Sequence, residues 1–199
     1  MRLLETIQIE NGQAKHLSYH NERMNRSRHQ LICAAGDIYL EEVLKIPEEF
    51  QQGIVKCRVL YNEQVCHIEF EHYRKRKTDA FHLIETQLIY DHKFEDRSVF
   101  EELKYPFSPS SEIILVKNGF ITDTSYSNLV FKDKNGNWLS PKNPLLLGTQ
   151  REFLLDEGII EEYEIKVSDL DQFTHFMMIN AMLDFNEREV ININLILDI

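Results

Sequence analysis

The amino-acid sequence predicts an α+β protein built on two small sheets. Patterns typical of strands and of helices are distributed unevenly along the chain, as expected when the two kinds of element segregate. Asn-Gly pairs, the strongest short hairpin signal, stand at 11–12, 118–119 and 135–136. With 199 residues, 43% of them apolar, the chain can bury a core without disulfides or a structural metal.

The first half alternates short strands with one long helix. Residues 2–9 alternate like a strand that turns at Asn11-Gly12, and a helix is expected from Ser18, as its N-cap, to about Ala35. The further elements expected in this half are strands over 54–61, 64–73 and 81–89 and a short helix over 98–103. Turn signals change between about 80 and 110, so we predict a smaller α+β domain over 1–88 and a larger one over 89–199.

The second half contains two hairpins and one further helix. The hairpins turn at Asn118-Gly119 and Asn135-Gly136, and a helix of about ten residues opens at Gly148-Thr149 and ends at Gly158. Strands are expected over 161–168 and 175–180, with a turn between them.

Charge and cysteine content narrow the function classes. A formal net charge of -11 repels nucleic acid and anionic membranes, so we expect neither as a partner. The three cysteines, Cys33, Cys57 and Cys66, lack a C-x-x-C spacing and a zinc pattern, so we expect no metal and a reducing cytoplasm. Glu5 interrupts the apolar start, so no signal peptide is expected.

Lys93 is the first candidate for chemistry. It follows a predicted strand, and a lysine at a strand end facing a cleft can become a Schiff-base nucleophile when burial or cationic neighbours lower its pKa. An isolated lysine is more often a solvated surface charge.

The segment Gly148-Thr149-Gln150-Arg151 is a candidate anion site. Backbone N–H groups at the start of a helix can hold a phosphate, and the threonine adds a hydroxyl. Thr149 could instead simply cap the helix. Arg23 could reach the same phosphate as a bidentate donor, or it could pair with Glu22 or Asp37 on the surface.

Asp123 follows the Asn118-Gly119 turn. A carboxylate beside a heteroaromatic nitrogen keeps that nitrogen protonated and makes the ring an electron sink. The cluster Thr122-Asp123-Thr124-Ser125 could equally be a set of turn residues that bond their own backbone.

The order of these signals resembles a known family. The stretches that carry the resemblance are ETI (5–7), HLSYHNERMNRS (16–27), KFEDRS (93–98), ILVKNGFITDTSYSNLVF (114–131), PLLLGTQR (144–151) and MINAM (178–182). They look like the successive motifs of the class IV aminotransferases, a fold-type IV group that uses pyridoxal 5'-phosphate (PLP).

The resemblance implies roles for individual residues. Lys93 would form the Schiff base with PLP, and Asp123 would face its ring nitrogen, where the family usually has glutamate. The other cofactor contacts it implies are Arg23, Asn128, Gly148, Thr149 and Gln150. The candidate substrate contacts are Arg58, Arg97 and Asn180, although Arg58 and Arg97 could each equally form a structural ion pair. The turn G-T-Q-R replaces the family's G-I-T-R.

The resemblance also implies an architecture and a reaction. We expect the two-domain D-amino acid aminotransferase-like fold with a trimmed N-terminal domain, as a homodimer. The MINAM strand and an arginine four residues beyond the lysine look most like aminodeoxychorismate lyase, an enzyme of folate biosynthesis that converts 4-amino-4-deoxychorismate to 4-aminobenzoate and pyruvate. The alternatives are a branched-chain or D-amino acid aminotransferase and a catalytically silent binding protein of the same fold.

Overall fold

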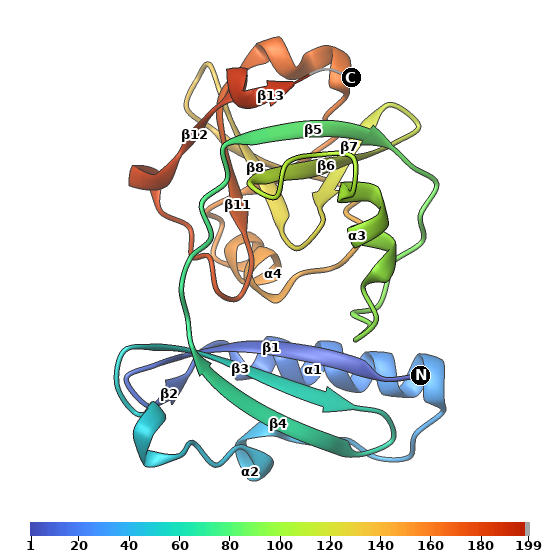
Figure 1. Ribbon diagram of the computed structural model, residues 1–199, viewed down its shortest axis with the longest axis vertical. Coiled ribbons are helices and arrows are strands. Elements are labelled where there is room, and N and C mark those ends of the chain that lie inside the picture. The colour runs from blue at the N-terminus through green and yellow to red at the C-terminus, as the bar shows by residue number, and fades with distance from the viewer. Residues whose placement is uncertain (198–199) are drawn as a thin grey trace. The chain divides into compact units, whose positions relative to one another are not determined.

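The computed structural model describes residues 1–197, and the chain divides into two compact units (Figure 1). Unit 1 comprises 1–75 and 92–96, and unit 2 comprises 76–91 and 97 onward. The sequence predicted a single boundary at 88/89, whereas contacts divide the chain at 75/76 and assign the short segment 92–96 to unit 1. That segment belongs to unit 1 because Leu4 N donates to Lys93 O at 2.9 Å and Glu95 N donates to Arg2 O at 3.1 Å.

Unit 1 is an antiparallel sheet in the order β2-β1-β3-β4. Its strands are β1 (Leu3–Glu10), β2 (Gln13–Ala14), β3 (Ile54–Tyr61) and β4 (Val65–His72). Its helices are α1 (Leu17–Ser27), a π-helical turn (Arg28–Ile32), α2 (Leu40–Val43) and a 3₁₀ turn (Glu48–Phe50). The strands predicted over 2–9, 54–61 and 64–73 and the Asn11-Gly12 hairpin are confirmed.

The core of unit 1 lies on one face of the sheet. Alternate side chains of β1 are fully buried, and Leu3, Ile7 and Ile9 form an apolar cluster with Met24 of α1. Glu5 shares the alternate positions of Leu3 and Ile7 along the strand, so it points to the same face of the sheet and is buried with them. A carboxylate therefore lies in an otherwise apolar stripe.

The start and end of the long helix differ from the prediction. The N-cap is His16, in the left-handed conformation with φ 54°, and not Ser18. The α-helix gives way to a π-helical turn at Arg28, and Cys33, also left-handed, ends that turn before Ala35. The guanidinium of Arg28 is buried and bonds the carbonyls of Gly36 and Glu63, so the loop that follows is attached to the helix.

Unit 2 is a mixed sheet whose main path runs β10-β9-β8-β7-β6-β5-β13, with β11 paired to both β8 and β12. The strands are β5 (Ala80–Glu85), β6 (Ser111–Lys117), β7 (Phe120–Thr124), β8 (Asn128–Asp133), β9 (Trp138–Pro141), β10 (Glu161–Tyr163), β11 (Phe173–Ile179), β12 (Ile191–Asn192) and β13 (Ile196–Leu197). Its α-helices are α3 (Ser98–Lys104) and α4 (Thr149–Asp156), and 3₁₀ turns cover Val167–Gln172, Glu187–Glu189 and Ile193–Leu195.

The local turn predictions in unit 2 are confirmed. Asn118 and Gly119 have φ values of 53° and 76°, the left-handed pair that a tight hairpin needs, and Gly136 turns the second hairpin with φ 94°. The strand predicted over 161–168 is shorter, because β10 ends at Tyr163 and a 3₁₀ turn begins at Val167. No helix within residues 1–197 is long and apolar enough to cross a bilayer.

Candidate functional site

Lys93 lies against β1 in unit 1. The hydrogen bond from Leu4 N to Lys93 O and the bridge between Leu3 and Phe94 fix its backbone beside the strand that carries Glu5. Burial lowers the pKa of His20; the hydrogen bond and charge of Glu5 oppose this, and the charges of Arg23 and Lys93 add to it.

Glu5, His20 and Arg23 form a buried ionic cluster next to Lys93. Glu5 Oε2 lies 2.6 Å from His20 Nδ1, and Arg23 donates from Nε to Glu5 Oε1 at 3.0 Å and from Nη2 to Oε2. Burial alone would raise the pKa of Glu5, but the Arg23 charge and the His20 hydrogen bond outweigh it and lower that pKa to about 2. Glu5 is therefore ionised at neutral pH.

This buried cluster was not predicted from the sequence. Its signal was Glu5 on the inward-facing side of β1, a residue used there as evidence against a signal peptide and as part of the ETI motif. Of the two surface residues considered as partners of Arg23, Glu22 pairs with Arg26 and Asp37 pairs with His29. Two of Arg23's nitrogens bind Glu5, and its predicted contact with a phosphate stays a prediction.

Asp123 and Asn128 form the centre of a second group, in unit 2. Asn128 Nδ2 donates to Asp123 Oδ1 at 2.7 Å, and Leu146 N donates to Asp123 Oδ2 at 2.9 Å. Burial raises the pKa of Asp123 to about 6, although these hydrogen bonds and the charge of Arg151 oppose the rise. The carboxylate is thus oriented at both oxygens and mostly ionised at pH 7.

The start of α4 adjoins this pair. Gly148 is the N-cap, and in the described residues no side chain caps the helix, although Thr149 and Gln150 are buried. A Cβ at Gly148 would lie 1.9 Å from Asn128 Oδ1, so only glycine fits there. Within residues 1–197, Gln150 Oε1 is buried without a hydrogen-bond partner.

Arg151 has a structural role at the same helix. Its guanidinium is buried and donates to Glu162 at 2.7 Å, Pro141 O at 3.0 Å and Ser140 Oγ at 3.1 Å. The helix start therefore presents backbone N–H groups and an amide rather than a cation.

The three residues predicted to contact substrate all have protein partners. Arg58 of β3 forms an ion pair with Glu69 of β4 in unit 1. In unit 2, Arg97 donates to Ser125 O, and Asn180 Nδ2 donates to Tyr126 O at 3.2 Å. The structure thus brings Arg97 and Asn180 to the same loop.

The predicted cofactor residues fall into two groups. Arg23 and Lys93 belong to unit 1. Asp123, Asn128 and Gly148 to Gln150 belong to unit 2, where they adjoin one another.

Comparison with known proteins identifies the family. Residues 110–193 match the family described as amino-transferase class IV. A Haemophilus influenzae protein of uncharacterized function is 35% identical over 183 residues, covering 90% of this chain and 97% of that protein. A crystal structure from Haemophilus somnus, described as a putative 4-amino-4-deoxychorismate lyase, is 32% identical with a TM-score of 0.84, covering 92% of this chain and 97% of the other.

This chain belongs to the class IV aminotransferases. The predicted fold class, a mixed α+β fold of fold type IV, is confirmed. The family is PLP-dependent, and a hypothetical aminotransferase from Mycobacterium tuberculosis was solved in a PLP-bound form. That structure is 15% identical with a TM-score of 0.75, covers 98% of this chain and 81% of its own, and shows the fold alone.

The residues of this class IV aminotransferase fit the phosphate end of PLP. The helix start supplies uncapped N–H donors, and Gly148 brings it close to the side chain of Asn128. Within residues 1–197, Gln150 Oε1 is buried without a hydrogen-bond partner; because phosphate oxygens accept hydrogen bonds, the amide would serve a phosphate through its Nε2 donor and not through this oxygen.

Proposed function

We propose that this class IV aminotransferase is a PLP-dependent lyase that converts 4-amino-4-deoxychorismate to 4-aminobenzoate and pyruvate. The observation that carries the proposal is the position of Lys93, held by its backbone to β1, the strand that carries Glu5 of the buried Glu5–His20–Arg23 cluster. The similarity to the Haemophilus somnus structure, described as such a lyase, supports the choice of reaction.

In this proposal the residues of unit 2 bind and orient the cofactor. The N–H groups at the start of α4, with Thr149 and Gln150, bind the phosphate. Asp123 faces the pyridine nitrogen, and its pKa of about 6 leaves it ionised at pH 7, so it accepts a hydrogen bond from a protonated ring. Asn128 and Leu146 N hold the carboxylate in place.

In unit 1, Lys93 is the amine that would hold the aldehyde of the cofactor and would move the proton. PLP, when bound, supplies an aldehyde that condenses with an amine and a ring that accepts an electron pair. Lys93 Nζ takes the proton from the substrate carbon that bears the amino group, and it returns a proton to the departing pyruvate. We assign Arg23 to the phosphate as well, with Glu5 fixing its orientation.

The same proposal includes a homodimer in the cytoplasm. The family resemblance supports the dimer, and three cysteines without a disulfide support a reducing compartment. Sedimentation of the purified chain at twice the mass of one chain, and recovery in the cytoplasmic fraction, are the expected results.

Borohydride trapping tests the site assignment. PLP-loaded protein is reduced and digested, and the modified peptide is identified by mass spectrometry. We expect the label on Lys93, no label in Lys93→Arg, and unchanged labelling in the control Lys15→Arg, whose surface lysine pairs with Glu10. A label on another lysine would overturn the assignment.

Product analysis tests the reaction. With 4-amino-4-deoxychorismate, the lyase releases pyruvate and 4-aminobenzoate without a second substrate. An aminotransferase would instead convert its cofactor to the pyridoxamine form when given an amino acid. A catalytically silent member of the family would show neither result.

A further inference from the structure

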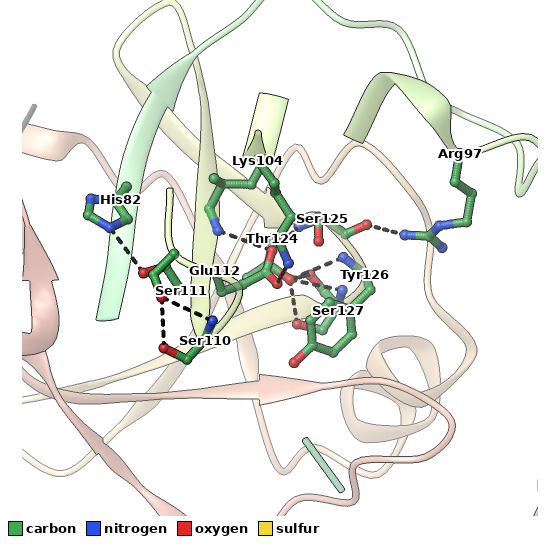
Figure 2. Close-up of polar contacts among 12 residues, drawn as sticks. His82, Arg97, Lys104, Ser110, Ser111, Glu112, Thr124, Ser125, Tyr126 and Ser127 are labelled. Carbon is green, nitrogen blue, oxygen red and sulfur yellow. Dashed lines mark hydrogen bonds and ion pairs between the residues drawn. The ribbon is translucent and has the colours of Figure 1, made fainter. Parts of the chain in front are cut away.

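The loop Thr124–Ser127, which joins β7 to β8, is held by side chains from other elements (Figure 2). Ser125 N donates to Glu112 Oε1 at 3.0 Å, and Arg97 Nη2 donates to Ser125 O. A carboxylate and a guanidinium thus engage the N–H and C=O groups of one residue.

Glu112 and Arg97 both connect this loop to α3. Glu112 is 2% exposed, and its second oxygen accepts from Lys104 at 2.8 Å, at the C-terminal end of α3. Arg97 is the N-cap of the same helix, and its guanidinium lies 5.2 Å from the centre of the Phe100 ring. Both ends of α3 therefore contribute to holding Ser125.

A third element holds the next residue. Asn180, which follows β11, donates from Nδ2 to Tyr126 O at 3.2 Å, and its Oδ1 accepts from Met182 N at 2.8 Å. The Asn180 amide is therefore oriented at both ends. Within the loop, Thr124 Oγ1 accepts from Ser127 N at 3.0 Å.

This loop is held at more points than the neighbouring hairpin. The hairpin at Asn118-Gly119 has a left-handed backbone at both residues, and one carboxylate oxygen, Glu85 Oε1, accepts from Asn118 N at 2.8 Å. The Thr124–Ser127 loop has a carboxylate, a guanidinium and an amide on its backbone, and charge-assisted hydrogen bonds are about twice as strong as neutral ones. The loop is bounded by Asp123 and Asn128, whose side chains bond each other at 2.7 Å.

We propose that Arg97, Glu112 and Asn180 are positioning residues that fix the Thr124–Ser127 loop and thereby keep Asp123 and Asn128 in register. Under the proposed function, Arg97 and Asn180 then serve the reaction by holding Asp123 in place and not by binding a substrate carboxylate. This role uses the hydrogen bonds that both side chains make in the structure.

The test is the titration of Asp123 in the chain without cofactor or substrate. Asn128, the N–H groups of Leu145 and Leu146 and the charge of Arg151 favour the ionised carboxylate. Loosening the loop weakens the Asn128 contact, so Arg97→Gln, Glu112→Gln and Asn180→Ala should each raise the pKa of Asp123, by about half a unit or more. Carbon-13 NMR of the aspartate carboxyl groups measures it.

Two controls separate positioning from a change of charge or a loss of fold. Glu187→Gln removes the same charge from an exposed ion pair with Lys132 and should leave the pKa of Asp123 unchanged. Arg97→Lys keeps a cationic donor for Ser125 O and should restore a value close to that of the parent protein. If Arg97→Gln does not fold, Asn180→Ala and Arg97→Lys still decide the question.

Measurements of kcat and KM provide a second test. A positioning role predicts that Arg97→Gln lowers kcat and changes KM by less than about twofold. An unchanged Asp123 pKa in all three variants, or a rise in KM alone, would overturn the proposal. If the protein shows no lyase activity, the proposed function fails, and the titration still decides whether these residues position the loop.

Discussion

Arg23 binds Glu5 through two nitrogens in the interior of unit 1, where both side chains are nearly or fully shielded from water. An ion pair at this depth costs desolvation energy that attraction and hydrogen bonds must offset. His20 contributes a further bond to the same carboxylate at 2.6 Å. The core of unit 1 therefore depends on a charged cluster as well as on apolar packing.

Replacing Glu5 by glutamine should destabilise the protein strongly. The Arg23 guanidinium would remain buried without a counter-charge, and removing one partner of a buried ion pair costs about 3–5 kcal/mol. Urea unfolding of Glu5→Gln measures the change in the free energy of unfolding.

The matched control is Glu71→Gln. Glu71 pairs with Lys56 across β3 and β4, but its side chain is 58% exposed, so its loss should cost less than about 1 kcal/mol. Equal losses in the two variants would show that the Glu5 cluster contributes no more than a surface ion pair.

Asp123 should make the protein less stable as pH rises from about 4 to about 6. Its pKa is raised from 3.8 to about 6 in the folded state, so between these values the folded chain holds a proton that the unfolded chain has released. The stability from this proton is complete below pH 3.8 and is lost as pH rises through about 6. The loss is on the order of 3 kcal/mol.

The variant Asp123→Asn isolates this effect. Asparagine does not titrate, so the fall in stability between about pH 4 and 6 should be smaller in the variant than in the parent, as measured by thermal unfolding across this range. Identical pH profiles for the two proteins would mean that Asp123 titrates normally.

Replacing Lys93 by methionine should raise the pKa of His20. Burial is the main cause of the lowered His20 pKa, and the Lys93 charge adds to it, so removing that charge moves the pKa upward. Nitrogen-15 NMR of the His20 ring gives the value. Lys15→Met, at a surface pair with Glu10, is the control and should have no effect. No change in Lys93→Met would place the amine away from the cluster.

Local sequence signals predicted most of the secondary structure. The hairpin at Asn118-Gly119 and the end of α4 before Gly158 follow from backbone preferences that a few residues determine. The pairing of β8 with β11, which joins Asn128 to Ile179, depends on contacts between distant segments, and no local pattern encodes it. Residues 92–96 likewise belong to unit 1 because of contacts with a distant segment of the chain.

The candidate site was predicted through its motifs, and its supporting contacts were not. Asp123, Asn128 and Gly148 were named from the order of motifs, and the structure brings them together. Glu112 carries no motif and lies in an apolar strand, so only the fold reveals that it holds Ser125. The role of Glu5 could not be predicted from local sequence either, because its partners, His20 and Arg23, lie in α1.

Replacing Gly148 by alanine should destabilise unit 2 and weaken cofactor binding. Gly148 has φ -80°, which any residue tolerates, so the penalty is steric: the new methyl would lie 1.9 Å from Asn128 Oδ1. Overpacking of this kind costs about 1–3 kcal/mol. It also displaces the amide that orients Asp123, so PLP titration should show a lower affinity in Gly148→Ala.

A double-mutant cycle with Asn128→Ala tests the steric cause. Asn128→Ala alone removes the hydrogen bonds to Asp123 and Leu146 O, but it also removes the atom that the new methyl would strike. The double variant should therefore be more stable than the sum of the two single losses predicts, by about 0.5–3 kcal/mol, the usual range for residues in contact. Strictly additive losses in urea unfolding of the four proteins would mean that the new methyl does not strike Asn128. The need for glycine at position 148 would then come from ligand binding and not from contact with Asn128.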